Sequence, residues 1–195
     1  MTPTKINFKI YQGSTFREVL RWESSTKVYK TITAISKTAP ISITAVGHGI
    51  PDGWRAKITN VLGMKEINNA EVYYPVSNVT TDTFEINEIN AYGFTAYSGG
   101  GIVEYNTPVD LATTTARLQV RSKVEDTEIL LDLTTENGGI TIDNVNKTIV
   151  IEITPTVTAA LNFSTHAVYS LELIANGIVT PFIMGTMTLV KEVTR

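Results

Sequence analysis

The segment GHGIPD at 47–52 brings together the residue types of a general base, because it sets His48 between two glycines and shortly before Asp52. An imidazole beside a carboxylate can accept a proton at neutral pH, since the ordinary pKa of histidine is about 6.5. Catalysis would also require a nucleophile held by that base, and none stands in a recognisable frame here. The alternative is a strand-end corner in which the glycines take positive φ and the ring bonds a backbone carbonyl. We favour the corner, and we interpret His166, which begins a predicted strand, as structural in the same way.

Carboxylates elsewhere could supply the acid–base pair of a glycosidase that cuts surface polysaccharide. The candidates fall mostly in turns or on the solvent faces of strands: Asp52, Asp82, Glu85, Glu88, Asp110, Asp132 and Asp143. The segment DNVNK at 143–147 has too few carboxylates for a calcium site and is more typical of a hairpin turn. The glycines at 99–101 precede no Lys-Ser or Lys-Thr pair, so they do not match a phosphate-binding loop. We therefore expect no enzyme activity, no cofactor and no metal ion, and the hydrolase stays open as an alternative only through these carboxylates.

Composition excludes further classes of function. The chain contains no cysteine, which rules out disulfides, zinc-thiolate sites and cysteine nucleophiles. Its formal net charge is −3 and it has no block of basic residues, so neither nucleic acid nor an anionic membrane surface is an expected partner. No run approaches the ~18 apolar residues of a membrane helix. The first residues, MTPTKINFKIYQGSTF, lack the basic and apolar regions of a signal peptide, and we expect the chain to fold in a cytoplasm.

Aromatic side chains concentrate in the middle of the chain, where they could stack on sugars or anchor a protein interface. They are Trp54, Tyr73, Tyr74, Tyr92, Phe94 and Tyr97. The competing interpretation is the core of a small domain, and we assign Tyr74 and Phe84 to such a core. Trp54 and Tyr92 lie next to turn residues and, with Tyr97, are our candidate interface aromatics.

Two arginines form the other candidate interface. Arg117 and Arg121 lie on one face of a predicted strand, with Gln119 between them. This spacing suits either a polar interface or a solvated strand face.

Strands must position all of these residues, because apolar and polar residues alternate with a period of two along most of the chain. Charged residues make up 18% of the sequence, below the roughly 25% usual for soluble domains, and β-branched residues are abundant. Turn dipeptides recur about every ten residues between Gly47 and Gly101, which is typical of a small barrel or sandwich. Hairpin turns are predicted at 143–147 and at the Asn-Gly pair of IANGIVT. Pro40 is expected at a strand edge or a break.

Helix signals are weak. The segment TPTVTAALNFST at 154–165 is the best helix candidate, with Thr156 or Thr158 as its cap, and MKEINNAEVYY at 64–74 has room for one turn. No helix is long enough to connect parallel strands, so we expect antiparallel sheets. The predicted fold class is all-β: an antiparallel β-sandwich with a small β-barrel-like domain inserted in an early loop.

The segment from about Ile41 to Glu104 resembles a small β domain that is common in bacteriophage virion proteins. That domain is named after the first catalytic cysteine half-domain of ubiquitin-activating enzyme. The likeness lies in ITAVGHGIPDGWRAKITNVLGMKEINNAEVYYPVSNVTTDTFEI, followed by FTAYSGGGIV. Ubiquitin chemistry requires a cysteine and an adenylation domain, so the resemblance implies no such chemistry here.

The flanking segments are similar to an Ig-like β-sandwich module of phage and prophage tail proteins, including the amino-terminal domains of receptor-binding baseplate components. This likeness rests on Asp-Leu before TARLQVR, on YSLEL and on the terminal GTMTLVKEVTR. The two resemblances nest, and we expect a discontinuous sandwich at 1–32 and 105–195 around an inserted domain at 33–104. Insertion into a loop costs little when the termini of the inserted domain lie close together. The strands VYKTITAIS and GIVEYNTPV are predicted to pair at the junction.

Both resemblances imply a structural protein of a tailed phage particle, in its tail, baseplate or neck, assembled in the host cytoplasm. The expected partners are other virion proteins and further copies of this chain, in a homo-oligomeric ring or sleeve. The alternative is a module that binds a host-surface glycan or receptor through the aromatic side chains of the inserted domain.

Overall fold

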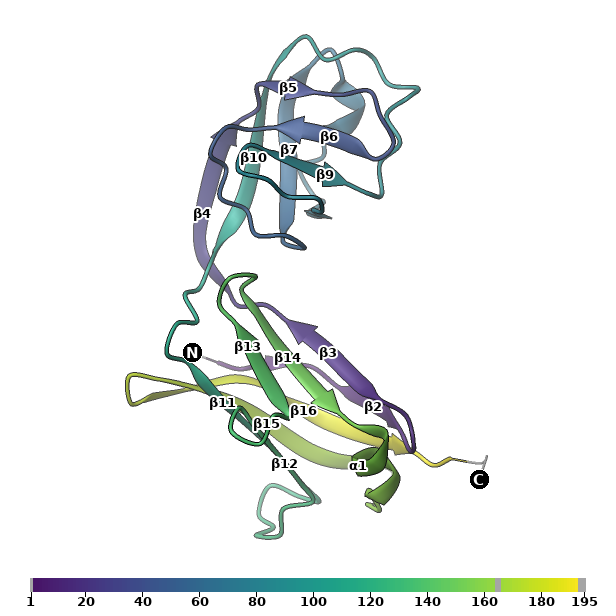
Figure 1. Ribbon diagram of the computed structural model, residues 1–195, viewed down its shortest axis with the longest axis vertical. Helices are drawn as coiled ribbons and strands as arrows, with labels where there is room; N and C mark the ends of the chain where they lie inside the picture. Colours follow the sequence, from purple (N-terminus) through teal and green to yellow (C-terminus); the bar gives the residue numbers. More distant parts are fainter. Residues whose placement is uncertain (1, 164–165, 193–195) are drawn as a thin grey trace. The chain divides into compact units, whose positions relative to one another are not determined.

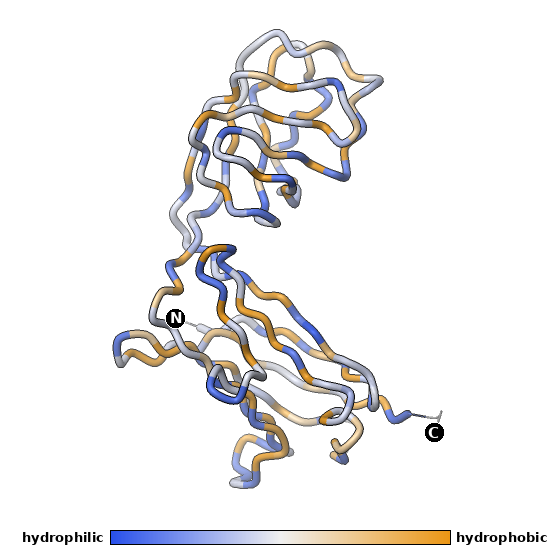
Figure 2. The backbone as a smooth tube through the Cα atoms, in the orientation of Figure 1, coloured by the Kyte–Doolittle hydropathy of each residue, from blue (hydrophilic) through white to orange (hydrophobic). Residues whose placement is uncertain are grey.

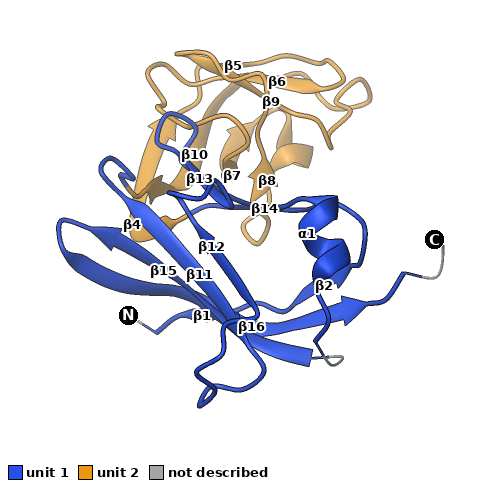
Figure 3. Cartoon of the chain, turned by 60° about the horizontal axis from the view of Figure 1, so that its bottom comes forward, with its two compact units in different colours: residues 1–21, 110–195 blue, residues 22–109 orange. Residues whose placement is uncertain are grey.

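The computed structural model describes residues 2–163 and 166–192, and the chain divides into two compact units. Unit 1 combines Met1–Arg21 with Asp110–Arg195, and unit 2 is the continuous segment Trp22–Val109 (Figure 3). Apart from one short α-helix and one 3₁₀ helix, the regular elements of the described residues are β-strands in both units, so the predicted all-β fold class is confirmed (Figure 1).

The inserted unit is longer at both ends than the predicted 33–104. Strand β4 (Glu23–Thr31) pairs antiparallel with β10 (Gly99–Pro108), and both complete strands therefore belong to unit 2. The pairing confirms the predicted contact between VYKTITAIS and GIVEYNTPV. The likeness to a small domain began only at Ile41, so it did not cover β4.

Unit 1 contains a larger and a smaller sheet. The larger sheet has the order β1-β16-β15-β11-β12, with β2 also paired to β16. Its strands are β1 (Thr4–Lys5), β2 (Phe8–Tyr11), β11 (Thr115–Arg121), β12 (Leu131–Thr134), β15 (His166–Ala175) and β16 (Ile178–Val190). The smaller sheet has the order β13-β14-β3, and its strands are β3 (Phe16–Leu20), β13 (Ile140–Asp143) and β14 (Thr148–Ile153).

Two pairings in unit 1 differ from the expected antiparallel arrangement. Strands β1 and β2 both run parallel to β16. The expectation assumed that parallel strands need a nearby crossover helix. Here the partners come from the two ends of the chain, so most of the chain lies between them and no local connection is needed.

The core of unit 1 lies between its two sheets and follows the period-two alternation of the strands. Strand β15 buries Ala167, Tyr169, Leu171 and Leu173 in turn. The ring of Phe8 stacks on Tyr169 at 5.0 Å and meets the edge of Phe16 at 5.3 Å, which joins the larger sheet to the smaller one. Figure 2 shows the hydrophobic positions alternating along these strands.

Unit 2 also contains two sheets. One has the order β4-β10-β7-β8, with β7 (Arg55–Leu62) and β8 (Tyr74–Pro75) beside the two strands given above. The other has the order β5-β6-β9, with strands β5 (Ala34–Ile35), β6 (Ile41–Thr44) and β9 (Thr83–Ile86). Their core includes the fully buried side chains Ile43, Trp54, Ile58, Met64 and Phe84.

Two hairpin turns, a break at Pro40 and one helical turn are present where the sequence predicted them. The turns at 143–147 and at Asn176-Gly177 each join two antiparallel strands, as expected, and Asn176 has the positive φ that such turns require. Pro40 precedes β6 in a break, which confirms its predicted place. The single helical turn expected within 64–74 is the 3₁₀ helix η1 (Lys65–Ile67).

The α-helix of unit 1 starts earlier than predicted. Helix α1 spans Pro155–Ala160 and is capped by Thr154, whose side chain accepts a hydrogen bond from the backbone of Val157. The predicted cap at Thr156 or Thr158 was wrong, because Pro155 is favoured at the first helical position and so places the cap one residue before it. Thr158 is buried instead, and its hydroxyl donates to the carbonyl oxygens of Ser14 and Pro155. The last two residues of the predicted segment lie outside the described residues.

Candidate interaction surface

His48 occupies a corner of unit 2 in which Gly47 and Gly49 take positive φ, as the sequence interpretation expected, and the structure shows in addition that its side chain is buried. Its side chain is 1% exposed, its Nδ1 accepts a hydrogen bond from the backbone of Ile50 at 3.0 Å, and its Nε2 lies 3.3 Å from the carbonyl oxygen of Thr83. Burial lowers the pKa of His48, so the neutral ring is favoured at neutral pH. Both ring nitrogens are engaged by the backbone, and the ring has no route to a substrate. This arrangement suits a structural corner and not a general base.

The aromatic candidates divide into buried and exposed side chains. Trp54 is fully buried, with its indole nitrogen donating to the carbonyl oxygen of Asn106 at 2.9 Å, so the prediction of an exposed anchor was wrong for this residue. The sequence showed only that Trp54 lies next to turn residues, and this did not indicate that its ring packs into the core of unit 2. The hydroxyl of half-buried Tyr97 donates to the carbonyl oxygen of Ile32 at 3.0 Å. Of the three, only Tyr92, at 66% exposed, presents most of its ring to solvent.

The two candidate arginines lie on the outer face of the larger sheet of unit 1. Strand register sets Arg117 opposite Glu172 of β15, and Arg121 opposite Val168. The guanidinium of Arg117 donates to Glu172 at 2.6 Å, and this contact raises the pKa of Arg117. Both residues of this pair are partly exposed, so the pair is a surface ion pair of modest energy.

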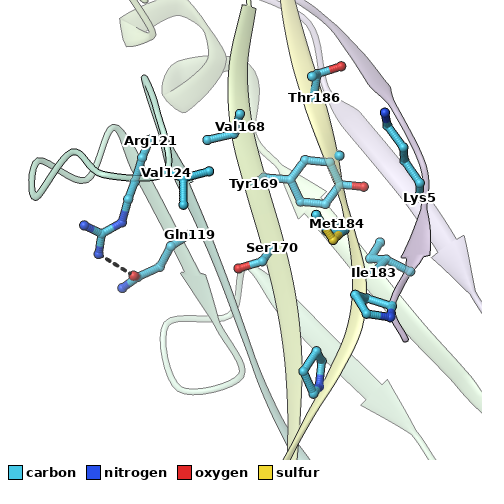
Figure 4. Close-up of a pocket in the computed structure, with 13 residues that line it drawn as sticks. Lys5, Gln119, Arg121, Val124, Val168, Tyr169, Ser170, Ile183, Met184 and Thr186 are labelled. Carbon is cyan, nitrogen blue, oxygen red and sulfur yellow. Dashed lines mark hydrogen bonds between the residues drawn. The ribbon is translucent and has the colours of Figure 1, made fainter. Parts of the chain in front are cut away.

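A hollow of about 450 Å³ lies beside that pair on the same face. Figure 4 shows residues of strands β1, β16, β15 and β11 around it. Its apolar surface includes Val124, Val168, Pro181 and Met184. Val124 is 78% exposed and Met184 is 47% exposed, so solvent reaches apolar side chains on the outside of the sandwich.

Cationic groups from two separate parts of the sequence border the hollow. Lys5 comes from β1 and Arg121 from the end of β11. Arg121 donates to the carbonyl oxygen of Asp126 at 2.6 Å and to Gln119 at 3.0 Å, which leaves three of its five N–H groups without an acceptor among the described residues. Exposed Lys5 forms no ion pair or hydrogen bond within the described part of the chain. The sequence named Arg117 and Arg121 but missed Lys5, because only strand pairing brings β1 to this face.

Unit 2 carries a charged cluster that the sequence also missed. Glu104, 8% exposed, accepts hydrogen bonds from Lys27 and from the hydroxyl of Tyr73 at 2.6 Å, and Lys57 lies 3.0 Å from its second oxygen. Arg55 binds Glu23 through two hydrogen bonds of 2.7 Å. Burial alone would raise the pKa of Glu104, but its three donors outweigh burial and lower that pKa to about 2. The carboxylates of Glu104 and Glu23 accept these hydrogen bonds within unit 2, so the cluster stabilises the unit.

Within residues 2–163 and 166–192, no group of three or more acidic or histidine side chains is placed to hold a metal ion. The described residues also contain no helix with the length and apolar character needed to cross a membrane. No protein-family model matches this chain, and no curated protein matches it.

Proposed function

We propose that this chain is a structural component of a tailed-bacteriophage virion, in the tail, baseplate or neck. It acts in assembly through protein–protein contacts in a ring or sleeve of further copies and other virion proteins. The two sequence resemblances supply the virion context. The observation that carries the contact role is the hollow on the outer face of the larger sheet of unit 1.

The character of this hollow favours a protein partner. The outer face of a solvated β-sandwich is expected to be polar, since only the inner face packs against the core. Here Met184 and Val124 expose apolar surface in a concave site that Lys5 and Arg121 border. Apolar surface with a polar rim is typical of protein interaction sites. The face therefore suits a contact between subunits.

The rival role, binding of a host-surface glycan through the inserted domain, has less support. Sugar recognition of that kind uses exposed aromatic rings as stacking platforms. Of the three aromatic candidates, Trp54 is fully buried and only Tyr92 exposes most of its ring. Around the hollow in unit 1 the aromatic residue is Tyr169, which is only 4% exposed.

No residue has a proposed catalytic role. The hydrolase alternative requires two carboxyl groups that face one another across a substrate site. Asp143 instead accepts hydrogen bonds from the backbone of Val145 and Asn146 within its own turn. Asp110 accepts from Lys147 at 3.2 Å. These contacts give both carboxylates a structural role at the surface of unit 1.

Composition and imaging of the virion test the proposal. Particles are purified from a producing host, their proteins are identified by mass spectrometry, and an antibody against the chain locates it by electron microscopy. We expect the chain in every particle, in several copies around the tail, baseplate or neck. Particles produced without the gene are the control and should lack the part that carries the label. Absence of the chain from intact particles would overturn the proposal.

A further inference from the structure

The loop between β11 and β12, residues 122–130, has a composition that complements the hollow. It contains the acidic residues Glu125, Asp126 and Glu128 against one basic residue, Lys123. Figure 1 shows this loop extending past the ends of the two strands that it connects. Ile129 is 43% exposed at the end of the loop, next to the start of β12. The loop therefore presents negative charge together with an apolar side chain.

The loop is held in place by hydrogen bonds between its backbone and strand β11. Arg121 donates to the carbonyl oxygen of Asp126 at 2.6 Å, and the backbone nitrogen of Leu130 donates to Val120 at 2.9 Å. Neither Glu125 nor Glu128 forms an ion pair with any of the described residues. Because the backbone is already ordered, binding through this loop costs less conformational entropy than binding through a flexible one.

The hollow has the opposite character on the same unit. Lys5 lies on β1 without an acidic partner, and Arg121 keeps N–H groups available to an added acceptor. Met184 and Val168 present apolar surface between these two cations. The hollow thus offers cations beside apolar side chains, and the loop, whose Val124 lies at the edge of the hollow, offers carboxylates beside Ile129.

We propose that the hollow of one copy binds the β11–β12 loop of a second copy of this chain. The carboxylates of Glu125 and Glu128 meet Lys5 and the available N–H groups of Arg121, and Ile129 covers Met184. The inference rests on the proposed function, because it names the partner of the same surface. Each copy carries both halves of the contact, so the contact repeats as a closed pair when it is reciprocal and as a ring or sleeve when it runs head to tail.

Thiol pairing tests this contact directly, because the chain has no cysteine of its own. One full-length variant carries Met184→Cys in the hollow, and another carries Thr127→Cys in the loop, so every proposed charged group is kept. We expect the mixture of the two to form a mixed disulfide well above the level obtained when Thr127→Cys is replaced by Glu71→Cys. Glu71 is exposed and lies in unit 2. A mixed disulfide no more frequent than in this control would overturn the inference.

Charge reversal tests the chemistry of the same contact. Lys5→Glu should weaken self-association, measured by sedimentation, by about two- to fivefold, since it replaces an exposed ion pair with a repulsion. Adding Glu125→Lys or Glu128→Lys singly to the same chain should restore the association in one of the two cases, because the pair with position 5 then forms with opposite signs while the other carboxylate still meets Arg121. Lys9 is exposed on β2 and lies outside the hollow, so Lys9→Glu makes an equal charge change and should leave self-association unchanged. Association unchanged by Lys5→Glu, or not restored by either compensating change, would overturn the inference.

The two proposals fail separately. A chain that is present in particles but forms no mixed disulfide keeps its structural role and has a different protein in the hollow, which overturns only the self-contact. A chain that forms the mixed disulfide but is absent from particles keeps the self-contact and loses the virion role.

Discussion

The hydroxyl of Tyr73 donates a hydrogen bond of 2.6 Å to Oε1 of Glu104, so a phenol links a nearly buried carboxylate to the cations around its ring. Lys57 lies 5.3 Å and Arg55 5.6 Å from the centre of that ring. Distances of this size allow cation–π attraction. Tyr73, which we had grouped with possible interface aromatics, therefore stabilises the outer face of one sheet of unit 2.

Replacing Glu104 should destabilise unit 2. Glu104→Gln removes the negative charge that Lys27 and Lys57 share, and we expect a loss of about 2 kcal/mol in the free energy of unfolding. Urea unfolding followed by tryptophan fluorescence measures it, because both tryptophans of the chain lie in unit 2. Glu71→Gln, at an exposed carboxylate of the same unit, is the control and should cost less than about 0.5 kcal/mol. Equal losses would contradict a special role for Glu104.

The stability of unit 2 should fall in acid. The pKa of Glu104 lies at about 2 in the folded chain, against 4.5 for an ordinary glutamate. A carboxyl group with a lowered folded pKa stabilises the fold above its unfolded pKa, and that stabilisation is lost as the pH falls toward the folded pKa. We therefore expect the urea midpoint of unit 2 to decrease from about pH 4.5 downward, and to decrease less in Glu104→Gln. Parallel pH profiles for the two proteins would show that another group is responsible.

Replacing His48 should lower the stability of unit 2. His48→Ala leaves the backbone nitrogen of Ile50 without its acceptor and opens a cavity in unit 2. We expect a loss of about 2 kcal/mol in the free energy of unfolding. Val46→Ala, at a 65% exposed side chain of the same corner, is the control and should be nearly neutral. A His48→Ala protein with unchanged stability would remove the structural explanation of this histidine.

Gly185 should tolerate no side chain. A Cβ built at this position of β16 would lie 1.8 Å from the carbonyl oxygen of Ile6, so the β1–β2 segment would have to move away from β16. We expect Gly185→Ala to destabilise unit 1 by about 2 kcal/mol or more and to speed hydrogen exchange at the amide of Ile6, which donates to Met184. Gly93→Ala adds the same methyl group where no heavy atom lies within 4 Å, and should change little. Normal protection of Ile6 in Gly185→Ala would refute the prediction.

Truncation of Trp54 should cost far more stability than truncation of Tyr92. Trp54→Ala empties the centre of the core of unit 2 and should cost about 3–5 kcal/mol, whereas Tyr92→Ala should cost less than about 0.5 kcal/mol. Calorimetric melting of both variants measures the difference without relying on tryptophan fluorescence. Binding to a glycan array that Tyr92→Ala abolishes, with the fold intact, would revive the receptor-binding alternative.

The sequence alone was enough to predict those features that depend on neighbouring residues. Alternation in TARLQVR predicted a strand with Arg117 and Arg121 on one face, because successive side chains of any strand point to opposite sides. The Asn176-Gly177 turn was predictable for the same local reason, since few residues other than Asn and Gly take positive φ at low cost. The corner at His48 likewise followed from the glycines on either side of it, which take positive φ at low cost.

Only the tertiary structure decided which strands meet. Period-two patterning states that a side chain lies on one of two faces, but it does not state which sheet covers that face or which strand lies alongside. The tertiary structure therefore determined that Trp54 is buried, that Lys27 and Lys57 share Glu104, and that Lys5 from the first strand borders the same hollow as Arg121. These contacts join residues that are distant in the chain, and their energies depend on strand register and packing, which no local pattern encodes.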